Sequence, residues 1–77
     1  MVLACTLISC KPGKYNQVVD ELKKLKEVKK ALGVHGRWDV VAEVEVTDLK
    51  VLGEVALRIN GLESVMASET LIGFQEG

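Results

Sequence analysis

The chain has 77 residues and a formal net charge of −1, and 48% of its residues are hydrophobic and 27% are charged. This length supports one small domain over residues 1–77, and the hydrophobic content excludes an intrinsically disordered chain. The near-neutral charge argues against a dedicated nucleic-acid-binding protein, and no stretch approaches the roughly 20 apolar residues that cross a membrane.

Charge is divided unevenly between the two halves of the chain. Residues 1–37 hold eight basic and three acidic side chains, whereas residues 38–77 hold two basic and eight acidic ones. The densest basic run, at 23–30, falls at a predicted helix C-terminus, where cations interact favourably with the helix dipole. We therefore interpret these lysines as a solvated face and expect no direct contact with nucleic acid.

Residues 2–9 form the first predicted strand, and its apolar side chains fall on both of its alternating faces. A strand with two apolar faces is central in its sheet or covered by a partner. Cys5 lies in this strand and Cys10 follows it, so the two stand ~16 Å apart, beyond the reach of a disulfide. Free thiols and the absence of a secretion signal predict a cytoplasmic protein.

Two helices and three further strands follow. After Pro12-Gly13 the apolar period becomes helical, with a stripe of Tyr15, Val18, Val19, Leu22 and Leu25. Strands are predicted at 28–35 and 38–46. Thr47-Asp48 then cap a second helix that ends at Asn60-Gly61, with a stripe of Leu49, Leu52, Val55, Ala56 and Ile59. Val51 and Leu57 fall outside this stripe and indicate a second contact surface. The last strand spans 65–74, before a loose tail at 75–77.

The connection at 34–39 holds the single tryptophan of the chain beside a glycine and an aspartate. Gly36 supplies a backbone that reaches positive φ, as hairpin turns often require. Trp38 places a large apolar side chain at the rim of the sheet, and Asp39 places a carboxylate beside it. The combination indicates contact with a small molecule or another subunit. The purely structural alternative is a turn former, a core lid and a turn cap.

The predicted order is β-α-β-β-α-β, and the second half of the chain repeats the first. A shift of 37 residues places apolar positions of one half on those of the other, such as Leu3 on Val40 and Val18 on Val55. Two right-handed βαβ units joined by a hairpin predict an α+β fold of the ferredoxin-like type. This fold is a four-stranded antiparallel sheet with both helices on one face.

The other face of the sheet is predicted to carry Val2, Ala4, Thr6, Ile8 and Val41. Such an apolar face needs a cover, and a symmetric partner stacking sheet on sheet would close a dimeric α/β barrel. Glu43 and Glu45 are expected on the same face, where they need cations or a place at the rim.

The turn Gly36-Arg37-Trp38-Asp39, the strand at 40–46 and the helix start Asp48-Leu49 resemble the effector-binding (RAM) domain of the Lrp/AsnC regulators. That family has a Gly-x-aromatic-Asp turn at this point. Residues 64–72 are similar to its Gly-Val-x-x-Thr-x-Thr strand, although Ser64 replaces the glycine and Ser68 a threonine. Full-length members add an N-terminal helix-turn-helix domain. Because the first strand begins at Val2, we expect a stand-alone effector domain.

The resemblance implies dimers, often assembled into rings of dimers, with a small amino acid bound between dimers near the turn. It carries ligand-binding roles to Gly36, Trp38, Asp39, Ser68 and Thr70, the last two with a simple strand role as the alternative. Asp39 would accept from the ligand's ammonium group, and N–H groups near Gly36 would meet its carboxylate. Full-length Lrp/AsnC regulators are further expected partners, whereas a membrane, a metal or a cofactor is not expected.

An enzyme is not expected either. His35 is the single histidine, with no serine or cysteine placed beside it as a nucleophile, and the chain has neither clustered metal ligands nor a phosphate loop. Two alternatives stay open: an ACT-like amino-acid-binding module with Pro12-Gly13 in its ligand loop, and a small dimeric α/β-barrel enzyme of the monooxygenase type. A ligand bound between dimers, at Pro12-Gly13, or inside the barrel would distinguish the three.

Overall fold

The structure is a computed structural model that describes residues 1–73 of the chain. Six elements follow in the predicted order: β1 (Val2–Cys10), α1 (Tyr15–Lys23), β2 (Val28–Gly33), β3 (Val40–Val46), α2 (Leu49–Asn60) and β4 (Val65–Ile72). The hairpin strands are shorter than predicted, because β2 ends before Val34 and β3 begins after Asp39. The predicted end of the last strand at Phe74 and the tail at 75–77 lie outside the described residues.

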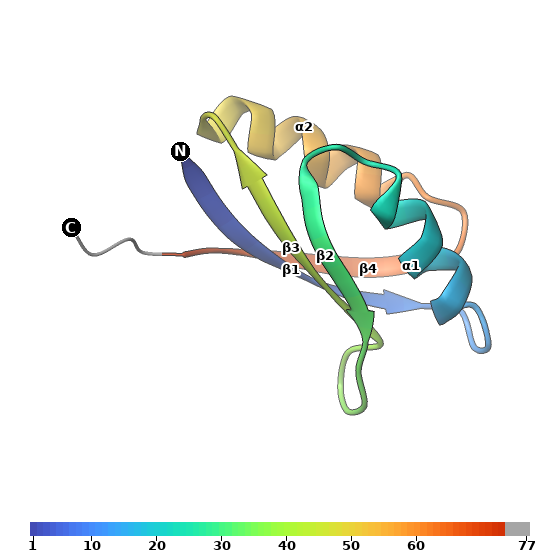
Figure 1. The fold of residues 1–77 in the computed structure, drawn as a ribbon. Coiled ribbons are helices and arrows are strands. Elements are labelled where there is room, and N and C mark those ends of the chain that lie inside the picture. The colour runs from blue at the N-terminus through green and yellow to red at the C-terminus, as the bar shows by residue number, and fades with distance from the viewer. Residues whose placement is uncertain (74–77) are drawn as a thin grey trace.

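The four strands form one sheet in the order β2-β3-β1-β4, and each neighbouring pair is antiparallel. Both helices lie on the same side of the sheet, with α1 toward β2 and α2 toward β4 (Figure 1). The strand order and the single helical layer confirm the ferredoxin-like α+β fold. Within residues 1–73, neither helix has the length and hydropathy of a membrane span.

The core lies between the helices and the helix-facing side of the sheet. It is built from aliphatic side chains of modest size, contributed by both helices and by the central strands. The largest that are fully buried are Ile8, Val18, Leu22, Val40, Val44, Val55 and Ile59. Because the helices cover one face of the sheet, the side chains that alternate with these strand residues form an uncovered face.

The prediction of which residues lie on the uncovered face is wrong for β1. Ala4, Thr6 and Ile8 are buried under the helices, beside the buried residues of β3. Val2 is partly buried against the same core. The uncovered face instead carries the alternate residues of β1 together with the predicted residues of β3, namely Leu3, Cys5, Leu7, Val41, Glu43 and Glu45.

The error arises because the sequence of β1 does not show which of its two alternating sets of side chains faces the helices. Since β1 is apolar on both faces, its alternation shows which residues share a face but not which face the helices cover. In the structure the helix-facing residues of both β1 and β3 are even-numbered. A shift of 37 is odd and would place a helix-facing residue of β1 on an outward-facing residue of β3, so the repeat does not hold for these two strands. From α1 onward the shift holds, because Val18 and Val55 are both buried.

The repeat is clearest at the turns that follow the two helices. Leu25 N–H donates to the Leu22 carbonyl at 3.0 Å, and Val28 N–H donates to the Leu25 carbonyl at 3.1 Å. The same two bonds, at 3.2 and 3.1 Å, join the residues 37 positions later, Ile59, Leu62 and Val65. Both halves therefore leave their helix and enter their second strand by the same turn.

Two residues of the predicted helical stripes are exposed. Tyr15 and Leu49 are 47% and 62% exposed, and each is the first residue of its helix. The apolar stripe of each helix therefore begins before the part of the helix that packs against the sheet. Val51, predicted on a second surface, is partly buried against the core, whereas Leu57 is exposed.

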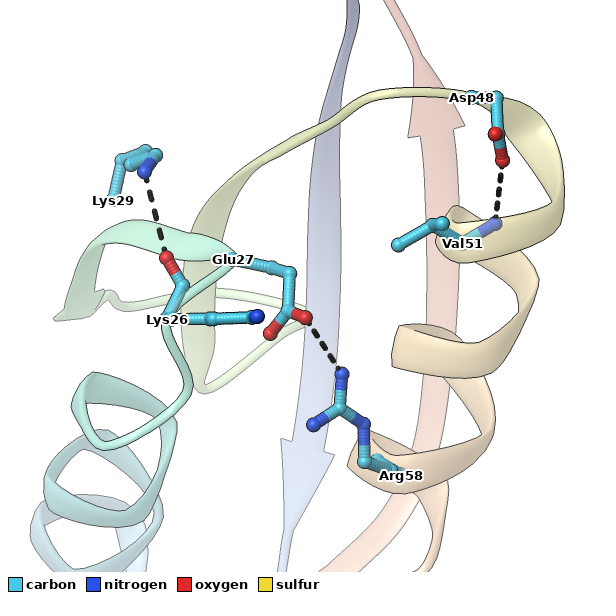
Figure 2. Close-up of polar contacts among 6 residues, drawn as sticks. All are labelled: Lys26, Glu27, Lys29, Asp48, Val51 and Arg58. Carbon is cyan, nitrogen blue, oxygen red and sulfur yellow. Dashed lines mark hydrogen bonds and ion pairs between the residues drawn. The ribbon is translucent and has the colours of Figure 1, made fainter.

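Two polar contacts tie α2 to its surroundings (Figure 2). Asp48 Oδ1 accepts from the Val51 N–H at 2.9 Å, which confirms the predicted cap. Arg58 donates to Glu27 Oε2 at 3.0 Å and so joins α2 to the turn before β2. A hydrogen bond from its own backbone amide holds the pKa of Glu27 below its ordinary value; burial opposes this effect and Arg58 adds to it.

Candidate functional site

The connection between β2 and β3 projects from one end of the sheet (Figure 1). It is closed by a hydrogen bond of 2.9 Å from the Val34 N–H to the Asp39 carbonyl. Gly36 has a φ of 126°, a backbone conformation that other L-residues rarely adopt, so its predicted role as a turn former is confirmed.

Asp39 attaches this connection to the end of β1. Its N–H donates to the Ile8 carbonyl at 2.9 Å, and its Oδ2 accepts from the Cys10 N–H at 2.9 Å. The carboxylate thereby satisfies a backbone donor where β1 ends. Since a carboxylate has two acceptor oxygens, Oδ1 can serve a second partner while Oδ2 holds the backbone.

A cavity of about 360 Å³ lies beside the connection and is lined by Tyr15, Gly33, Val34, His35 and Asp39. Its volume falls in the range of small-molecule sites, roughly 300–1,000 Å³. The lining combines a carboxylate, an imidazole and a phenol with the apolar side chain of a valine. This arrangement suits a small polar molecule that carries a positive group and an apolar portion.

Tyr15 approaches the backbone of β2 closely. A Cβ atom added at Gly33 would lie 3.0 Å from Tyr15 Cδ2, so the glycine makes room for the ring. Sequence reasoning placed Tyr15 in the core and gave Gly33 no role. The available signal was a glycine inside an otherwise β-forming run, which often marks the close approach of another group.

Cys10 is buried next to this site. Burial raises the pKa of its thiol, and the neighbouring Asp39 carboxylate raises the pKa further. A thiol that stays protonated is a poor nucleophile and a poor metal ligand. Cys5 and Cys10 are free thiols, as predicted, and β1 extends to include Cys10. Within residues 1–73 no three His, Cys, Asp or Glu side chains are placed to hold a metal ion.

Four of the predicted ligand residues do not line this cavity. Gly36 and Trp38, which is half-buried, lie in the adjoining connection. Ser68 donates to Asn60 Oδ1 at 2.6 Å, and the Thr70 hydroxyl is 3.2 Å from the Thr6 hydroxyl. The structure thus brings Asp39 together with four residues that sequence reasoning did not assign to ligand binding, namely Tyr15, Gly33, Val34 and His35. The ligand-binding roles of Gly36, Trp38, Asp39, Ser68 and Thr70 remain predictions.

A second hollow, of about 410 Å³, lies where β2 begins and β3 ends. It is lined by Lys26, Glu27, Lys29, Glu45, Val46, Thr47 and Val51. Its acids already have partners within the chain, because Glu27 pairs with Arg58 at 3.0 Å and Glu45 with Lys29 at 4.0 Å. The cavity beside the β2–β3 connection is therefore the better candidate site.

Comparison with known proteins gives matches at the level of family and sequence. The family model of the Lrp/AsnC ligand binding domain matches residues 3–76. The HTH-type transcriptional regulator FL11 of Pyrococcus furiosus is 28% identical over 71 residues, which cover 92% of this chain. The chain spans 47% of the length of that regulator.

Solved structures agree with these matches. The protein TTHA0845 from Thermus thermophilus superimposes with a TM-score of 0.93 at 29% identity, covering 100% of this chain and 98% of that one. Escherichia coli AsnC superimposes with a TM-score of 0.90 at 25% identity, covering 97% of this chain and 52% of that one. With the family match running over almost all of the sequence, the chain is a regulator-type ligand-binding domain and belongs to the Lrp/AsnC ligand binding domain family.

Proposed function

We propose that this domain senses a small amino acid, which binds in the cavity beside the β2–β3 connection. The observation that carries this proposal is the cavity itself, in which Asp39, Tyr15 and His35 meet at one end of a regulator-type ligand-binding domain. The proposed role is one of binding and assembly, and it requires no catalytic step, metal or cofactor.

The groups around the cavity match those of an amino acid. Asp39 Oδ1 accepts from the ligand's ammonium group while Oδ2 keeps its bond to Cys10 N–H. Backbone N–H groups of the connection around Gly36 meet the ligand's carboxylate, as anions are commonly bound by backbone amides in turns. The apolar part of the ligand lies against Tyr15 and Val34. Because the site offers a carboxylate to a cation and backbone N–H groups to an anion, it favours a zwitterion over a simple anion.

The uncovered sheet face supports the pairing of two copies. Its apolar side chains are half-buried or exposed and come from every strand: Leu3, Cys5, Leu7, Leu32, Val41 and Leu71. Apolar side chains gathered on one uncovered face, with the charged Glu43 and Glu45 among them, favour an interface. Stacking it on a second copy closes the dimeric α/β barrel and supplies stability that a chain of this size gains by oligomerisation.

Assembly beyond the dimer would then involve the end of the sheet that carries the connection. The half-buried Trp38 lies at this end of the sheet, and aromatic residues are frequent interface anchors. We therefore place the effector between dimers, in a ring of dimers, with Gly36 and Trp38 at the joint and Ser68 and Thr70 in supporting roles. Full-length Lrp/AsnC regulators are the proposed protein partners, in the cytoplasm, where free thiols stay reduced.

A thermal-shift screen of the twenty amino acids tests the ligand directly. A ligand that binds only the folded domain raises its stability by about 2.7 kcal/mol at a hundredfold excess over its dissociation constant. The amino acid that gives the largest shift is then titrated calorimetrically into the wild type and into Asp39→Asn. The asparagine keeps an acceptor for the Cys10 N–H but loses the charge, so we expect affinity to fall about tenfold or more.

Asp20→Asn is the matched control, because Asp20 is an exposed acid on α1 that does not line the cavity. It should bind the same amino acid with wild-type affinity. The proposal is wrong if none of the twenty amino acids raises the melting temperature, or if Asp39→Asn binds the selected ligand as tightly as the wild type.

A further inference from the structure

Gly33 is the last residue of β2, and its own backbone does not require a glycine. Among residues 1–73 the glycines with positive φ are Gly13 and Gly36, so an alanine can adopt the backbone conformation of Gly33. Glycine in a strand lowers stability, because it loses more conformational freedom on folding and offers no side chain to pack. The reason for a glycine at this position therefore lies in a neighbouring group.

The ring of Tyr15 occupies the space that a side chain at position 33 would fill. A Cβ atom added at Gly33 would lie 3.0 Å from Cδ2 of the ring and 3.3 Å from Cε2. Both distances are shorter than the optimal carbon–carbon contact of about 3.5–4.0 Å. One edge of the ring thus rests on the strand, while Tyr15 as a whole stays 47% exposed and lines the cavity.

The wall that these two residues form lies on the helix-covered side of the sheet. Gly33 pairs with Val40, and residues that pair across antiparallel strands point to the same face. Val40 is fully buried, so a side chain at position 33 would point toward the helical layer, where Tyr15 begins α1. This wall is therefore built within one subunit, between the start of α1 and the end of β2.

The lining of the cavity divides into polar groups and an apolar wall. The polar groups are His35 and Asp39, and Asp39 is held in place by the bond of 2.9 Å from the Cys10 N–H. The apolar wall is the Tyr15 ring together with the half-buried Val34. In the proposed function Asp39 binds the ammonium group, which every amino acid shares. The apolar wall is left to distinguish one side chain from another.

We propose that Tyr15 and Gly33 together determine which amino acid the cavity accepts. The ring is the wall on which a large apolar side chain, such as that of leucine or phenylalanine, packs. Gly33 acts through the ring, because its missing Cβ atom lets the ring lie against β2 and leaves room for the ligand. A wall that is already positioned loses little freedom when the ligand binds, which favours affinity. The inference rests on the proposed function and adds the class of ligand and the residues that select it.

Ligands of different size test this selectivity. L-leucine, L-phenylalanine and L-alanine are titrated calorimetrically into wild type, Tyr15→Ala, Gly33→Ala and the double variant. L-alanine carries the same ammonium and carboxylate groups with a side chain of one methyl group, so it reports the polar contacts. We expect wild type to bind the better of the two large ligands about tenfold more tightly than L-alanine, or more, since a single methylene in an apolar pocket changes selectivity by this order.

Both substitutions should remove this preference. Tyr15→Ala deletes the wall. Gly33→Ala displaces the ring, which takes the ligand's room if it moves inward and leaves the ligand's side chain if it moves outward. In each variant we expect the affinity for the large ligand to fall about tenfold and that for L-alanine to change by less than about threefold. The double variant should bind like Tyr15→Ala, because Gly33 acts only through the ring.

A conservative variant and a matched control accompany these substitutions. Tyr15→Phe keeps the ring without the hydroxyl group and should retain the preference for the large ligand over L-alanine. Gly53→Ala adds the same methyl group on α2, where nothing lies within 4 Å of an added Cβ atom, and should bind all three amino acids as wild type does. Circular dichroism of each variant checks that the subunit is folded.

The outcomes separate this inference from the proposed function. If the screen of twenty amino acids selects a small or a charged ligand, the choice of a large apolar side chain is wrong, whereas amino-acid sensing stands. If Tyr15→Ala and Gly33→Ala weaken all three ligands equally, or none of them, the two residues do not select the ligand. If none of the twenty amino acids binds, the proposed function fails and this inference fails with it.

Discussion

At the scale of single residues, Asp39 and Tyr15 each make a structural contact and also line the candidate cavity. Asp39 holds the end of β1 through Cys10 and also lines the candidate cavity. The structural and the ligand-binding interpretations of this residue are therefore compatible, because they use different oxygens of one carboxylate. Tyr15 likewise packs on Gly33 and forms a wall of the cavity.

The ion pair of Glu27 gives a prediction at this scale. Its side chain is 11% exposed and pairs with Arg58, which is 50% exposed. Because Arg58 is partly screened by water, we expect Glu27→Gln to lower the free energy of unfolding at pH 7 by about 1 kcal/mol, measured by chemical denaturation. Glu63→Gln is the control, since Glu63 is exposed in the corresponding turn after α2, and it should have little effect.

The same pair predicts how the effect depends on pH. The folded-state pKa of Glu27 lies below its ordinary value of 4.5, so its stabilisation is fully present above pH 4.5. It is lost as the pH falls through the folded-state pKa. The difference between wild type and Glu27→Gln should therefore stay constant near neutral pH and shrink in acid. A difference that grew below pH 4.5 would contradict this assignment.

At the scale of elements, local periodicity predicted most of the fold. The order of the six elements, the cap at Asp48 and the end of α2 could be predicted because each depends on residues close in sequence. The covered face of β1 could not, since both of its faces are apolar and the choice depends on tertiary packing. The cavity was missed for a related reason: Tyr15 and Gly33 are far apart in sequence and meet only when α1 packs on β2.

Helix α2 provides a prediction about backbone conformation. Gly53 lies inside this helix with nothing within 4 Å of an added Cβ atom, so alanine fits there without strain. Gly53→Ala should raise the free energy of unfolding by about 0.5–1 kcal/mol, measured by chemical denaturation at fixed protein concentration. Gly36→Ala is the contrasting variant, because its φ of 126° strains an alanine, and it should lower stability. Equal effects of the two substitutions would contradict the backbone assignments.

At the scale of the whole molecule, the main feature is a sheet that the helices cover on one face only. The helices bury one side of the sheet, and the other side presents apolar residues from all four strands. The proposed dimer follows from the need to cover this face, whereas the proposed ring depends on the end of the sheet that carries Trp38.

Sedimentation equilibrium of the wild-type protein over a wide range of concentrations tests this central claim most directly. The subunit mass is 8.4 kDa. We expect the measured mass to be at least twice that value, because pairing removes the uncovered face from water. A mass that stays at 8.4 kDa up to the highest concentration would contradict the account.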